Sequence, residues 1–275
     1  MTASTNLKLA VIGTGGMAKL FTRILRGRFK EIAIISRDPK KAKRLSRRLG
    51  VSYTKLSDLK QFDILLFTTP SQHLPNMVKA VSQNLKAEAL VMDVSSVKVG
   101  IVEKVAEVLP SSIEYISLHP LFAPSTRKIQ GNNLVMIPIR GELFLNMMKR
   151  LFEELGLRVV VSSPEEHDKI MALVQVAHHL SYLSLALALW NFLGSERLDP
   201  YVTRSLRKTF SMFKMFSRNL KVIKEISSLN SYKAWAINEL VNSMKKLEEG
   251  DEQAWRTVEK ALEELSKLSF LEQVE

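Results

Sequence analysis

The first 161 residues alternate short apolar runs with amphipathic segments. The apolar runs predict strands at residues 8–13, 32–36, 52–55, 64–68, 90–93, 115–118, 134–138 and 158–161. Apolar positions at helical spacing predict intervening helices at residues 17–26, 40–49, 74–84, 99–109 and 143–155. Apolar strands that alternate with helices are typical of a parallel sheet covered on both faces. We therefore predict an α/β domain with a doubly wound sheet over residues 1–161.

Helical patterning replaces the strand signals from Pro164 onward. Residues 163–166 read Ser-Pro-Glu-Glu, which is typical of a helix start with a serine N-cap and proline at the first helical position. Beyond it the pattern stays helical, with turns expected over residues 194–200 and at Gly250. We predict a second, all-α domain over residues 162–275.

The stretch 171–193 is apolar enough to raise the question of a membrane span. It also contains polar side chains, at Gln175, His178, His179, Ser181, Tyr182, Ser184 and Asn191. This is too much polarity for an ordinary spanning helix, whereas a helix that is apolar nearly all round is typical of a core or a subunit interface. We therefore predict a buried core or dimer-interface helix and no membrane partner.

Composition excludes several classes of protein. The chain has 275 residues, 46% of them hydrophobic, and no cysteine. A disordered or fibrous chain, a disulfide scaffold, a thiol nucleophile and a cysteine-ligated metal are therefore excluded, and we expect no metal site. The first residues lack a charged segment followed by an apolar one, so no secretory signal is expected. The missing cysteine suits a cytosolic or thermophilic source, and we predict a cytoplasmic protein.

Charge is unevenly distributed along the chain. Lys and Arg number 40 against 28 Asp and Glu, a net charge of +12. Twelve of the basic residues lie between Lys19 and Arg48, where only Glu31 and Asp38 oppose them. Such an excess fits nucleic acid, an anionic membrane surface or small anionic ligands. Because no aromatic interleaving or nucleic-acid motif accompanies it, we expect solvated helix faces and small anions, and no nucleic acid.

The first expected strand leads into a glycine-rich turn that reads Gly13-Thr14-Gly15-Gly16-Met17-Ala18. The turn fits the G-x-G-x-x-G/A pattern at a strand-to-helix junction, which predicts a Rossmann-type dinucleotide-binding loop. Gly13 permits the tight turn, Gly15 lets the backbone approach a pyrophosphate, and Ala18 allows close packing of helix on strand. The helix N-terminus offers unpaired N–H groups to the phosphates. We expect residues 13–17 to bind the cofactor.

The end of the second expected strand bears on the type of cofactor. NAD-binding chains usually place an acidic residue there for the ribose 2′-OH, whereas this chain has Ser36 and Arg37 before Asp38. Ser36 can bond a 2′-phosphate, and Arg37 can pair with it and stack on the adenine. Lys40 and Lys41 lie within reach at the start of the next helix. We predict NADP; the alternative is NAD, with its ribose on Asp38. The cofactor is also expected to border the end of the fourth strand, at Thr68, Thr69 and Pro70.

Three further stretches follow in order: Asp93-Val-Ser-Ser-Val-Lys98, His119-Pro-Leu-Phe-Ala-Pro-Ser125 and Glu166-His-Asp-Lys-Ile-Met-Ala-Leu-Val-Gln-Val-Ala-His-His179. In this order and at these spacings they resemble the prephenate dehydrogenases of tyrosine biosynthesis. The resemblance covers nearly the whole chain, because the C-terminal helices are similar to the family's helical dimerisation domain. One departure is Ala123, which stands where the family usually has glycine.

The resemblance implies oxidative decarboxylation of prephenate to 4-hydroxyphenylpyruvate, with a hydride passing to a nicotinamide. By resemblance His119 is the histidine at the ring hydroxyl of the substrate, where a neutral imidazole can polarise or accept the proton. Ser96 resembles the family serine that bonds this histidine and the substrate hydroxyl, with Ser95 as the fallback. The family often carries a fused chorismate mutase or a regulatory domain, and we expect neither.

The resemblance also implies substrate-binding residues in the helical domain. His179 matches the family's substrate-domain histidine, and Gln175, four positions earlier, would share its face on a regular helix. The family binds substrate carboxylates through an arginine of this domain. Here we choose Arg218, with three competitors: Arg204, Arg207 and Lys224. Other polar residues of this region are expected to be structural, through burial, interdomain packing or capping: His178, His167 and Asp168.

Three alternatives stay open. A dehydrogenase acting on arogenate, the amino analogue of prephenate, needs the same hydride chemistry. An NADP-dependent imine reductase or coenzyme-F420-linked reductase shares the N-terminal loop but needs no His119 followed by proline. A non-catalytic NADPH-sensing or nucleic-acid-binding module is the alternative from a different class. The expected partners are a small-molecule substrate and a second copy of the chain, bound through the C-terminal helices.

Overall fold

The computed structural model of the protein describes residues 5–268, apart from the side chains of residues 194–196. It forms two compact units, Met1–Asp168 and Lys169–Glu275, and each is described by itself. The division falls inside a helix, seven residues beyond the boundary expected from the sequence. Residues 1–4 and 269–275, at the outer ends of the two expected domains, lie outside the described residues.

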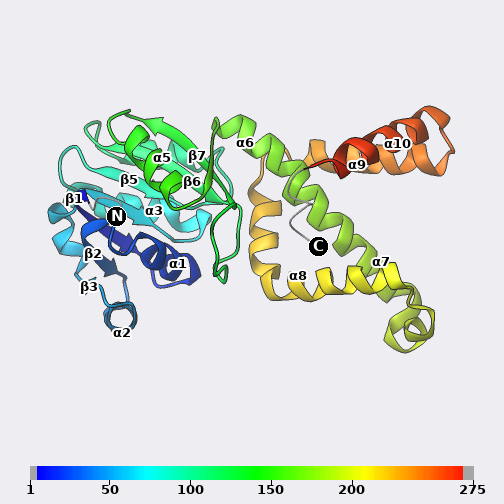
Figure 1. The fold of residues 1–275 in the computed structure, drawn as a ribbon, viewed down its shortest axis with the longest axis horizontal. Helices are drawn as coiled ribbons and strands as arrows, with labels where there is room; N and C mark the ends of the chain where they lie inside the picture. Colours follow the sequence, from blue (N-terminus) through cyan, green and yellow to red (C-terminus); the bar gives the residue numbers. More distant parts are fainter. Residues whose placement is uncertain (1–4, 269–275) are drawn as a thin grey trace. The chain divides into compact units, whose positions relative to one another are not determined.

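The first unit is built on one eight-stranded sheet (Figure 1). Its strands are β1 (Thr5–Ile12), β2 (Phe29–Ile35), β3 (Ser52–Tyr53), β4 (Ile64–Phe67), β5 (Leu90–Asp93), β6 (Glu114–Pro120), β7 (Asn133–Arg140) and β8 (Arg158–Val161). The order β3-β2-β1-β4-β5-β6-β7-β8 begins with the six parallel strands of a Rossmann fold. The expected doubly wound α/β fold is therefore confirmed.

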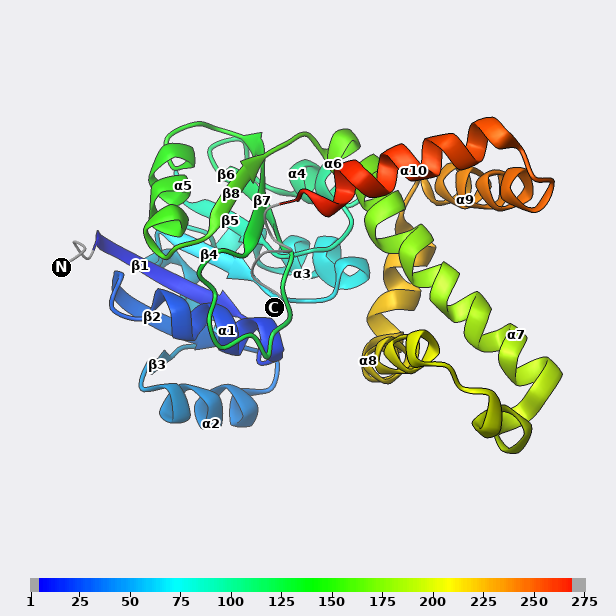
Figure 2. The same cartoon turned by 45° about the vertical axis from the view of Figure 1, so that its right-hand side comes forward.

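Helices cover both faces of this sheet (Figure 2). The helical segments of this unit are α1 (Gly16–Leu25), α2 (Pro39–Leu49), η1 (Leu56–Gln61), η2 (Ser71–His73), α3 (Leu74–Val81), η3 (Ser82–Asn84), α4 (Val102–Val108) and α5 (Leu145–Glu154). The helix α6 (Pro164–Met171) spans the division between the two units. One buried apolar cluster joins α1 and α5 to the sheet, and a second joins α3 and α4 to the opposite face. The continuous apolar strands follow from this double burial.

Two local features differ from the purely alternating pattern. β7 runs antiparallel to β6, because the loop between them contains no crossover helix and returns the chain directly. The helix expected from residue 99 begins only at Val102. The backbone N–H groups of Lys98 and Val99 instead donate to the Asp168 carboxylate, and Gly100 has a φ of +78°. The residues ahead of α4 are thereby held as a loop.

The second unit is entirely helical (Figure 1). After α6 the chain continues through a π-helical segment, η4 (Ala172–Ala177), and then α7 (His178–Leu198), η5 (Asp199–Tyr201), α8 (Arg204–Leu229), α9 (Lys233–Glu248) and α10 (Glu252–Ser266). Glu166 N donates to Ser163 Oγ at 3.1 Å, which confirms the expected N-cap. Gly250, with a φ of +73°, makes the expected turn between α9 and α10. The turn expected from residue 194 begins later, because α7 persists to Leu198 and ends next to Pro200.

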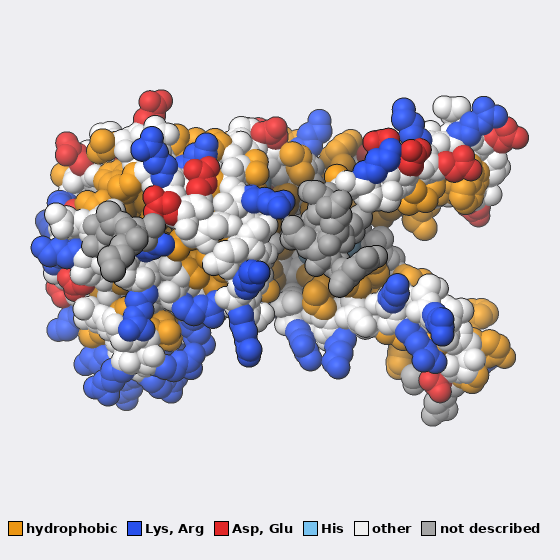
Figure 3. All heavy atoms as spheres, in the orientation of Figure 1, with side chains coloured by type: hydrophobic (Ala, Val, Ile, Leu, Met, Phe, Trp, Pro, Cys, Tyr) orange, Lys and Arg blue, Asp and Glu red, His pale blue; other side chains and the backbone are white. Residues whose placement is uncertain are grey.

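The apolar run of this unit is largely uncovered. Within the described residues, Pro164–Leu193 is the one helical segment long and apolar enough to cross a bilayer, and 22% of its most apolar window is buried. Trp190 is 67% exposed and Phe192 82% exposed. Figure 3 shows hydrophobic side chains on the surface of this unit. Within the single chain this helix is therefore not a buried core helix, which is one of the two roles that its composition predicts.

Candidate active site

The glycine-rich turn follows β1 at the carboxyl edge of the sheet, between β1 and β4. Gly13 has a φ of +134°, and a Cβ at this position would collide with the Thr68 hydroxyl. That hydroxyl donates a hydrogen bond to the carbonyl of Ile12 at 2.9 Å. Only glycine fits a turn that is both left-handed and this close to β4. The turn is thereby fixed against β4, between the two strands where the strand order of the sheet reverses.

The N-terminus of α1 is open for an anion. Gly15 is the N-cap of the helix, no side chain caps it, and nothing lies within 4 Å of a Cβ built there. The Thr69 hydroxyl oxygen is buried without a hydrogen-bond partner among the described residues. Exposed helix N–H groups next to bare glycine backbone suit a pyrophosphate. The residues present therefore fit a dinucleotide, with Thr14 and Met17 half-buried in the same turn and Pro70 exposed beyond β4.

The end of β2 presents a hydroxyl and several cations. Ser36 Oγ accepts the N–H of Asp38, which leaves its own proton free to donate. Asp38 is the N-cap of α2 and accepts the N–H of Lys41, and this hydrogen bond lowers the pKa of its carboxyl. Arg37 and Lys40 are exposed. Figure 3 shows Lys and Arg side chains gathered over α2, at the lower left.

Polar side chains follow one face of β5 and β6 toward the carboxyl edge. Asp93 ends β5, and Tyr115, Ser117 and His119 alternate along β6, so all four lie on the face that packs against α3 and α4. Tyr115 donates its hydroxyl to Asp93 at 2.7 Å. Burial and the adjacent Asp93 carboxylate raise the pKa of this hydroxyl, so Tyr115 is a neutral donor.

Lys98 inserts its side chain into this polar row. It is fully buried, and its Nζ donates to Ser117 Oγ at 2.7 Å and to the carbonyls of Ser95 and Leu118 at 2.8 Å. Asp93 lies 4.0 Å from the same nitrogen. Burial lowers the pKa of Lys98 to about 8, against the attraction of nearby carboxylates. One ammonium therefore joins the loop after β5 to the last residues of β6.

His119 stands at the end of this row and is 3% exposed. Its Nδ1 lies 2.8 Å from Nε2 of His167, and Nδ1 of His167 lies 2.8 Å from Oδ1 of Asp168. The three groups, all buried, form what we call the His119–His167–Asp168 triad. Burial lowers the pKa of His119 well below its usual value, and the Lys98 ammonium lowers it further. Burial also lowers the pKa of His167, although Asp168 opposes that shift.

The two candidate serines differ in their surroundings. Ser95 is buried, donates its N–H to Asp93 at 2.7 Å and receives Lys98 Nζ at 3.4 Å on its hydroxyl. Ser96 is half-buried, and its hydroxyl makes no hydrogen bond to any described residue. Ser95 therefore serves the Lys98 network, whereas Ser96 is available to a ligand.

In the helical unit, His179 and Gln175 each carry an unpaired buried atom. Nδ1 of His179 and Oε1 of Gln175 have no hydrogen-bond partner among the described residues. The His179 ring packs edge-on against Phe216 of α8, with centroids 5.0 Å apart, and burial lowers its pKa. Gln175 lies in the π-helical segment, so the regular spacing expected between these residues does not apply. Such widened turns are frequent at functional sites.

The cation expected beside them lies elsewhere on its helix. Arg218 is exposed, and no hydrogen bond or ring contact in the described part of the chain joins it to His179 or Gln175. It follows Phe216 by two positions, which is about 200° around a helix, so it projects away from the side that meets His179. Three basic residues expected as its competitors are likewise exposed: Arg204, Arg207 and Lys224.

The sequence reading did not assign a site role to three residues that the structure joins to His119. Lys98 was recognised only as part of a motif, and His167 and Asp168 were expected to act in packing or capping. Asp168 does accept backbone N–H groups, and these include the N–H groups of Lys98 and Val99, which lie outside its own helix. The signal available in the sequence was the position of all three residues inside the motifs 93–98 and 166–179, which otherwise describe the site.

The nucleotide-binding region matches a family model described as "Prephenate dehydrogenase, nucleotide-binding domain" over residues 21–161. A probable arogenate/prephenate dehydrogenase of Methanocaldococcus jannaschii is 29% identical over 192 residues, which are 68% of this chain and 43% of that relative. The chloroplastic arogenate dehydrogenase 1 of Arabidopsis thaliana is 29% identical over 191 residues, 64% of this chain and 30% of that relative. The matches thus span less than half the length of these curated relatives.

Solved structures share the fold along nearly the whole chain. The arogenate dehydrogenase of Synechocystis has a TM-score of 0.78 at 18% identity, and the match covers 95% of this chain and 99% of that one. The prephenate dehydrogenase from A. aeolicus, in complex with hydroxyphenyl propionate and NAD+, has a TM-score of 0.77 at 21% identity over 99% of both chains. At these identities the likeness establishes a common fold.

Replacing the buried ammonium tests its structural role. Lys98→Met keeps the length of the side chain but leaves the Ser117 hydroxyl and two buried carbonyls without their donor. We expect the free energy of unfolding at pH 7 to fall by about 2–4 kcal/mol, measured by urea denaturation. The exposed Lys104→Met on α4 is the matched control, with an expected change within about 0.5 kcal/mol. Equal effects of the two substitutions would contradict the assignment.

Lys98 also predicts a dependence of stability on pH. Its pKa is about 8 in the folded protein, against an ordinary value of 10.5. Between these values the unfolded chain binds a proton that the folded protein has lost, so the contribution of Lys98 to stability rises with pH. We expect the free energy of unfolding of wild type, relative to that of Lys98→Met, to rise by about 3 kcal/mol from pH 7.5 to 10.5. Denaturation of both proteins across this range measures the gain, and a constant difference would refute it.

Proposed function

The chain belongs to the prephenate dehydrogenase family, and from this premise we propose that it oxidatively decarboxylates prephenate to 4-hydroxyphenylpyruvate with NADP. The observation that carries the proposal is His119, a buried histidine of lowered pKa at the carboxyl edge of a dinucleotide-binding sheet. The loop after His119 packs against the glycine-rich turn: a Cβ built on Gly16 would lie 2.7 Å from the side chain of Pro124. The proposed base and the proposed cofactor site thus share one edge of the sheet.

The proposed reaction requires a protein group that accepts the proton of the substrate hydroxyl. The nicotinamide, when bound, supplies the acceptor for the hydride that leaves C4 of the substrate ring. In our proposal the neutral imidazole of His119 takes the proton of the C4 hydroxyl, so that C4 becomes a carbonyl-like centre. The bonding pair released by loss of CO₂ from the ring passes to the C4 oxygen, which takes the proton back from His119 to give the phenol. Ser96, whose hydroxyl has no partner among the described residues, is proposed to hydrogen-bond the substrate hydroxyl beside His119.

The preference for NADP rests on the end of β2. Asp38, the one acidic residue available for the ribose 2′-OH of NAD, already caps α2. The Ser36 hydroxyl can still donate, and Arg37 and Lys40 add positive charge next to it. A 2′-phosphate needs such donors and cations, so these residues support the NADP proposal. The remainder of the proposed cofactor site is the glycine-rich turn with Thr68, Thr69 and Pro70.

In the helical unit we propose that Gln175 and His179 bind the substrate, because their buried polar atoms lack partners among the described residues. Arg218 stays the proposed carboxylate ligand, with Arg204, Arg207 and Lys224 as competitors. Because Arg218 is exposed on the face of α8 opposite Phe216, the substrate carboxylate would have to approach that face. Substrate affinity of alanine variants at the four positions would identify the ligand.

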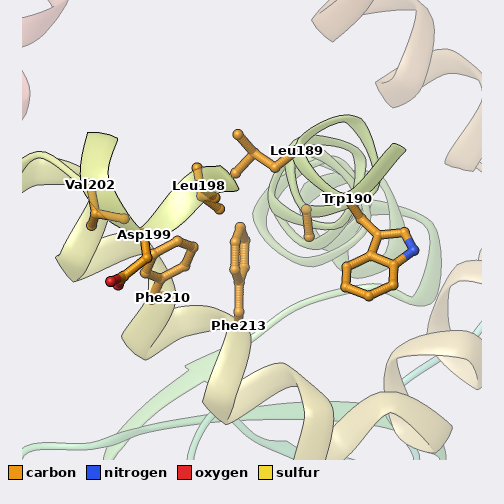
Figure 4. Close-up of a pocket in the computed structure, with 8 residues that line it drawn as sticks. Leu189, Trp190, Leu198, Asp199, Val202, Phe210 and Phe213 are labelled. Carbon is orange, nitrogen blue, oxygen red and sulfur yellow. The ribbon is translucent and has the colours of Figure 1, made fainter. Parts of the chain in front are cut away.

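A second copy of the chain is the proposed partner of the helical unit. A hollow of about 320 Å³ lies at the end of α7, where Phe210 and Phe213 of α8 face Leu189 and Leu198 (Figure 4). Trp190 of α7 is exposed at its border. Burial of these apolar groups favours association. We therefore propose that the exposed apolar surface of α7 is a dimer interface and not a membrane span, as fits a cytoplasmic enzyme.

Arogenate is the second candidate substrate, because the relatives include proteins named arogenate dehydrogenase. The decisive assay follows the absorbance of reduced cofactor with prephenate and with arogenate, each with NAD and with NADP. Turnover of prephenate with NADP in preference to the other pairs supports the proposal. Turnover of arogenate alone would replace the substrate. No turnover, together with salt-dependent binding to arbitrary DNA, would favour a non-catalytic module.

The proposed base is tested by His119→Asn. The asparagine amide can still donate to His167, so the fold is expected to persist, but no imidazole Nε2 remains. We expect kcat to fall by about 10²–10⁴-fold, with NADPH affinity, measured by cofactor fluorescence, within about twofold of wild type. Unchanged kcat would rule out His119 as the proton acceptor.

Cofactor choice is tested by Arg37→Ala. Loss of a charge-assisted bond to the 2′-phosphate is expected to weaken NADP binding about tenfold or more, while NAD affinity changes little. Arg48→Ala, exposed at the far end of α2, is the matched control for net charge. Equal losses for both cofactors in Arg37→Ala, or an equal NADP loss in Arg48→Ala, would remove the 2′-phosphate assignment.

A further inference from the structure

The structure contains a row of buried hydrogen bonds behind His119 that the proposed reaction does not yet use. We propose that His167 and Asp168 are positioning residues, which hold His119 in the tautomer with its proton on Nδ1 and so leave Nε2 as the acceptor for the substrate hydroxyl. This inference rests on the proposed function for its catalytic consequence. The tautomer itself follows from the contacts of the protein.

The direction of the hydrogen bonds is set at Asp168. Its carboxylate receives the backbone N–H groups of Lys98, at 3.0 and 3.1 Å, and of Val99 at 2.9 Å. Both carboxylate oxygens thus act as hydrogen-bond acceptors. The nitrogen of His167 that lies 2.8 Å from Oδ1, which is Nδ1, must therefore carry a proton.

The next bond follows from the charge of His167. Its burial and the nearby Lys98 ammonium lower its pKa, which favours the neutral ring. A neutral imidazole has one donor and one acceptor nitrogen. Because Nδ1 is the donor to Asp168, Nε2 of His167 carries a lone pair, and this lone pair faces Nδ1 of His119 at 2.8 Å.

The tautomer of His119 is then determined. Its Nδ1 must donate, since the opposite choice would set two lone pairs against each other at 2.8 Å in a buried site. Burial and Lys98 lower the pKa of His119 and keep the ring neutral, so Nε2 is left unprotonated. This is the nitrogen that a general base requires. When Nε2 takes a proton, the Nδ1–H bond to His167 persists and stabilises the imidazolium.

The scaffold makes this arrangement rigid. His167 is 2% exposed and Asp168 is fully buried, and both lie in the early turns of α6, whose N-cap is Ser163. The rings of His119 and His167 meet at a centroid distance of 5.0 Å and an angle of 68°. The positioning residues therefore come from the helix that follows β8, whereas the proposed base comes from β6.

Three substitutions separate positioning from simple packing. His167→Gln offers an amide oxygen to Nδ1 of His119 and is expected to conserve the tautomer, whereas His167→Phe offers no acceptor. Asp168→Asn offers a side-chain N–H to His167 and is expected to reverse both bonds, so that the proton of His119 moves to Nε2. Glu165→Gln, exposed on the same helix, is the matched acid-to-amide control.

The readout is the ¹⁵N NMR spectrum of histidine-labelled protein without substrate. The chain has five histidines, and His119→Asn assigns the signals of His119. We expect Nδ1 of His119 to be protonated in wild type, Glu165→Gln and His167→Gln, and Nε2 to be protonated in Asp168→Asn and His167→Phe. A wild-type His119 with its proton on Nε2 would overturn the proposal, as would an unchanged tautomer in folded Asp168→Asn.

Kinetics provide the second readout. We expect kcat to fall about 10²-fold or more in Asp168→Asn and His167→Phe, with KM for substrate and cofactor nearly unchanged, and His167→Gln to recover most of the loss. Equal losses in His167→Gln and His167→Phe would overturn the proposal. If His167→Phe does not fold, Asp168→Asn and His167→Gln decide it. Failure of the proposed function is distinguishable, because it would abolish wild-type turnover and leave the spectrum unchanged.

Discussion

The buried ammonium of Lys98 is the interaction on which the rest of the site depends. It donates to the carbonyl of Ser95, immediately before Ser96, and to the carbonyl of Leu118, immediately before His119. The backbone N–H of the same residue donates to Asp168. One side chain and its own peptide therefore fix the loop after β5, the end of β6 and the start of α6. The proposed base His119 and Ser96, proposed to hydrogen-bond the substrate hydroxyl, each follow a residue whose carbonyl is bonded to Lys98.

The buried charge of Lys98 has two electrostatic effects, one on its own pKa and one on the pKa of the two neighbouring histidines. An ammonium in a buried site is costly, and the lowered pKa of Lys98 expresses that cost. The same charge lowers the pKa of His119 and His167, which keeps both rings neutral. A neutral resting imidazole is what a proton acceptor needs. The cost of burying Lys98 thus serves the proposed chemistry as well as the fold.

The parts of the fold that the sequence predicted are those governed by neighbouring residues. The strand runs, the glycine-rich turn and the cap at Ser163 follow from local patterns. The direction of β7 depends on how the chain returns after β6, and the π-helical turn at Gln175 depends on packing, so neither has a local signal. The sequence places His167 and Asp168 near a helix start, where packing or capping is expected, but their partners lie 48 and 70 positions away.

The end of β2 shows how a small displacement of one side chain bears on cofactor choice. An acidic residue directly at the strand end would face the ribose of a bound dinucleotide. Here the acid comes after Ser36 and Arg37, as the N-cap of the next helix, and its carboxylate accepts the N–H of Lys41. The cap uses Oδ1 of this carboxylate, and Oδ2 lies 3.5 Å from Nζ of Lys41. The strand end itself carries a hydroxyl and a cation, and these are the groups on which the NADP proposal rests.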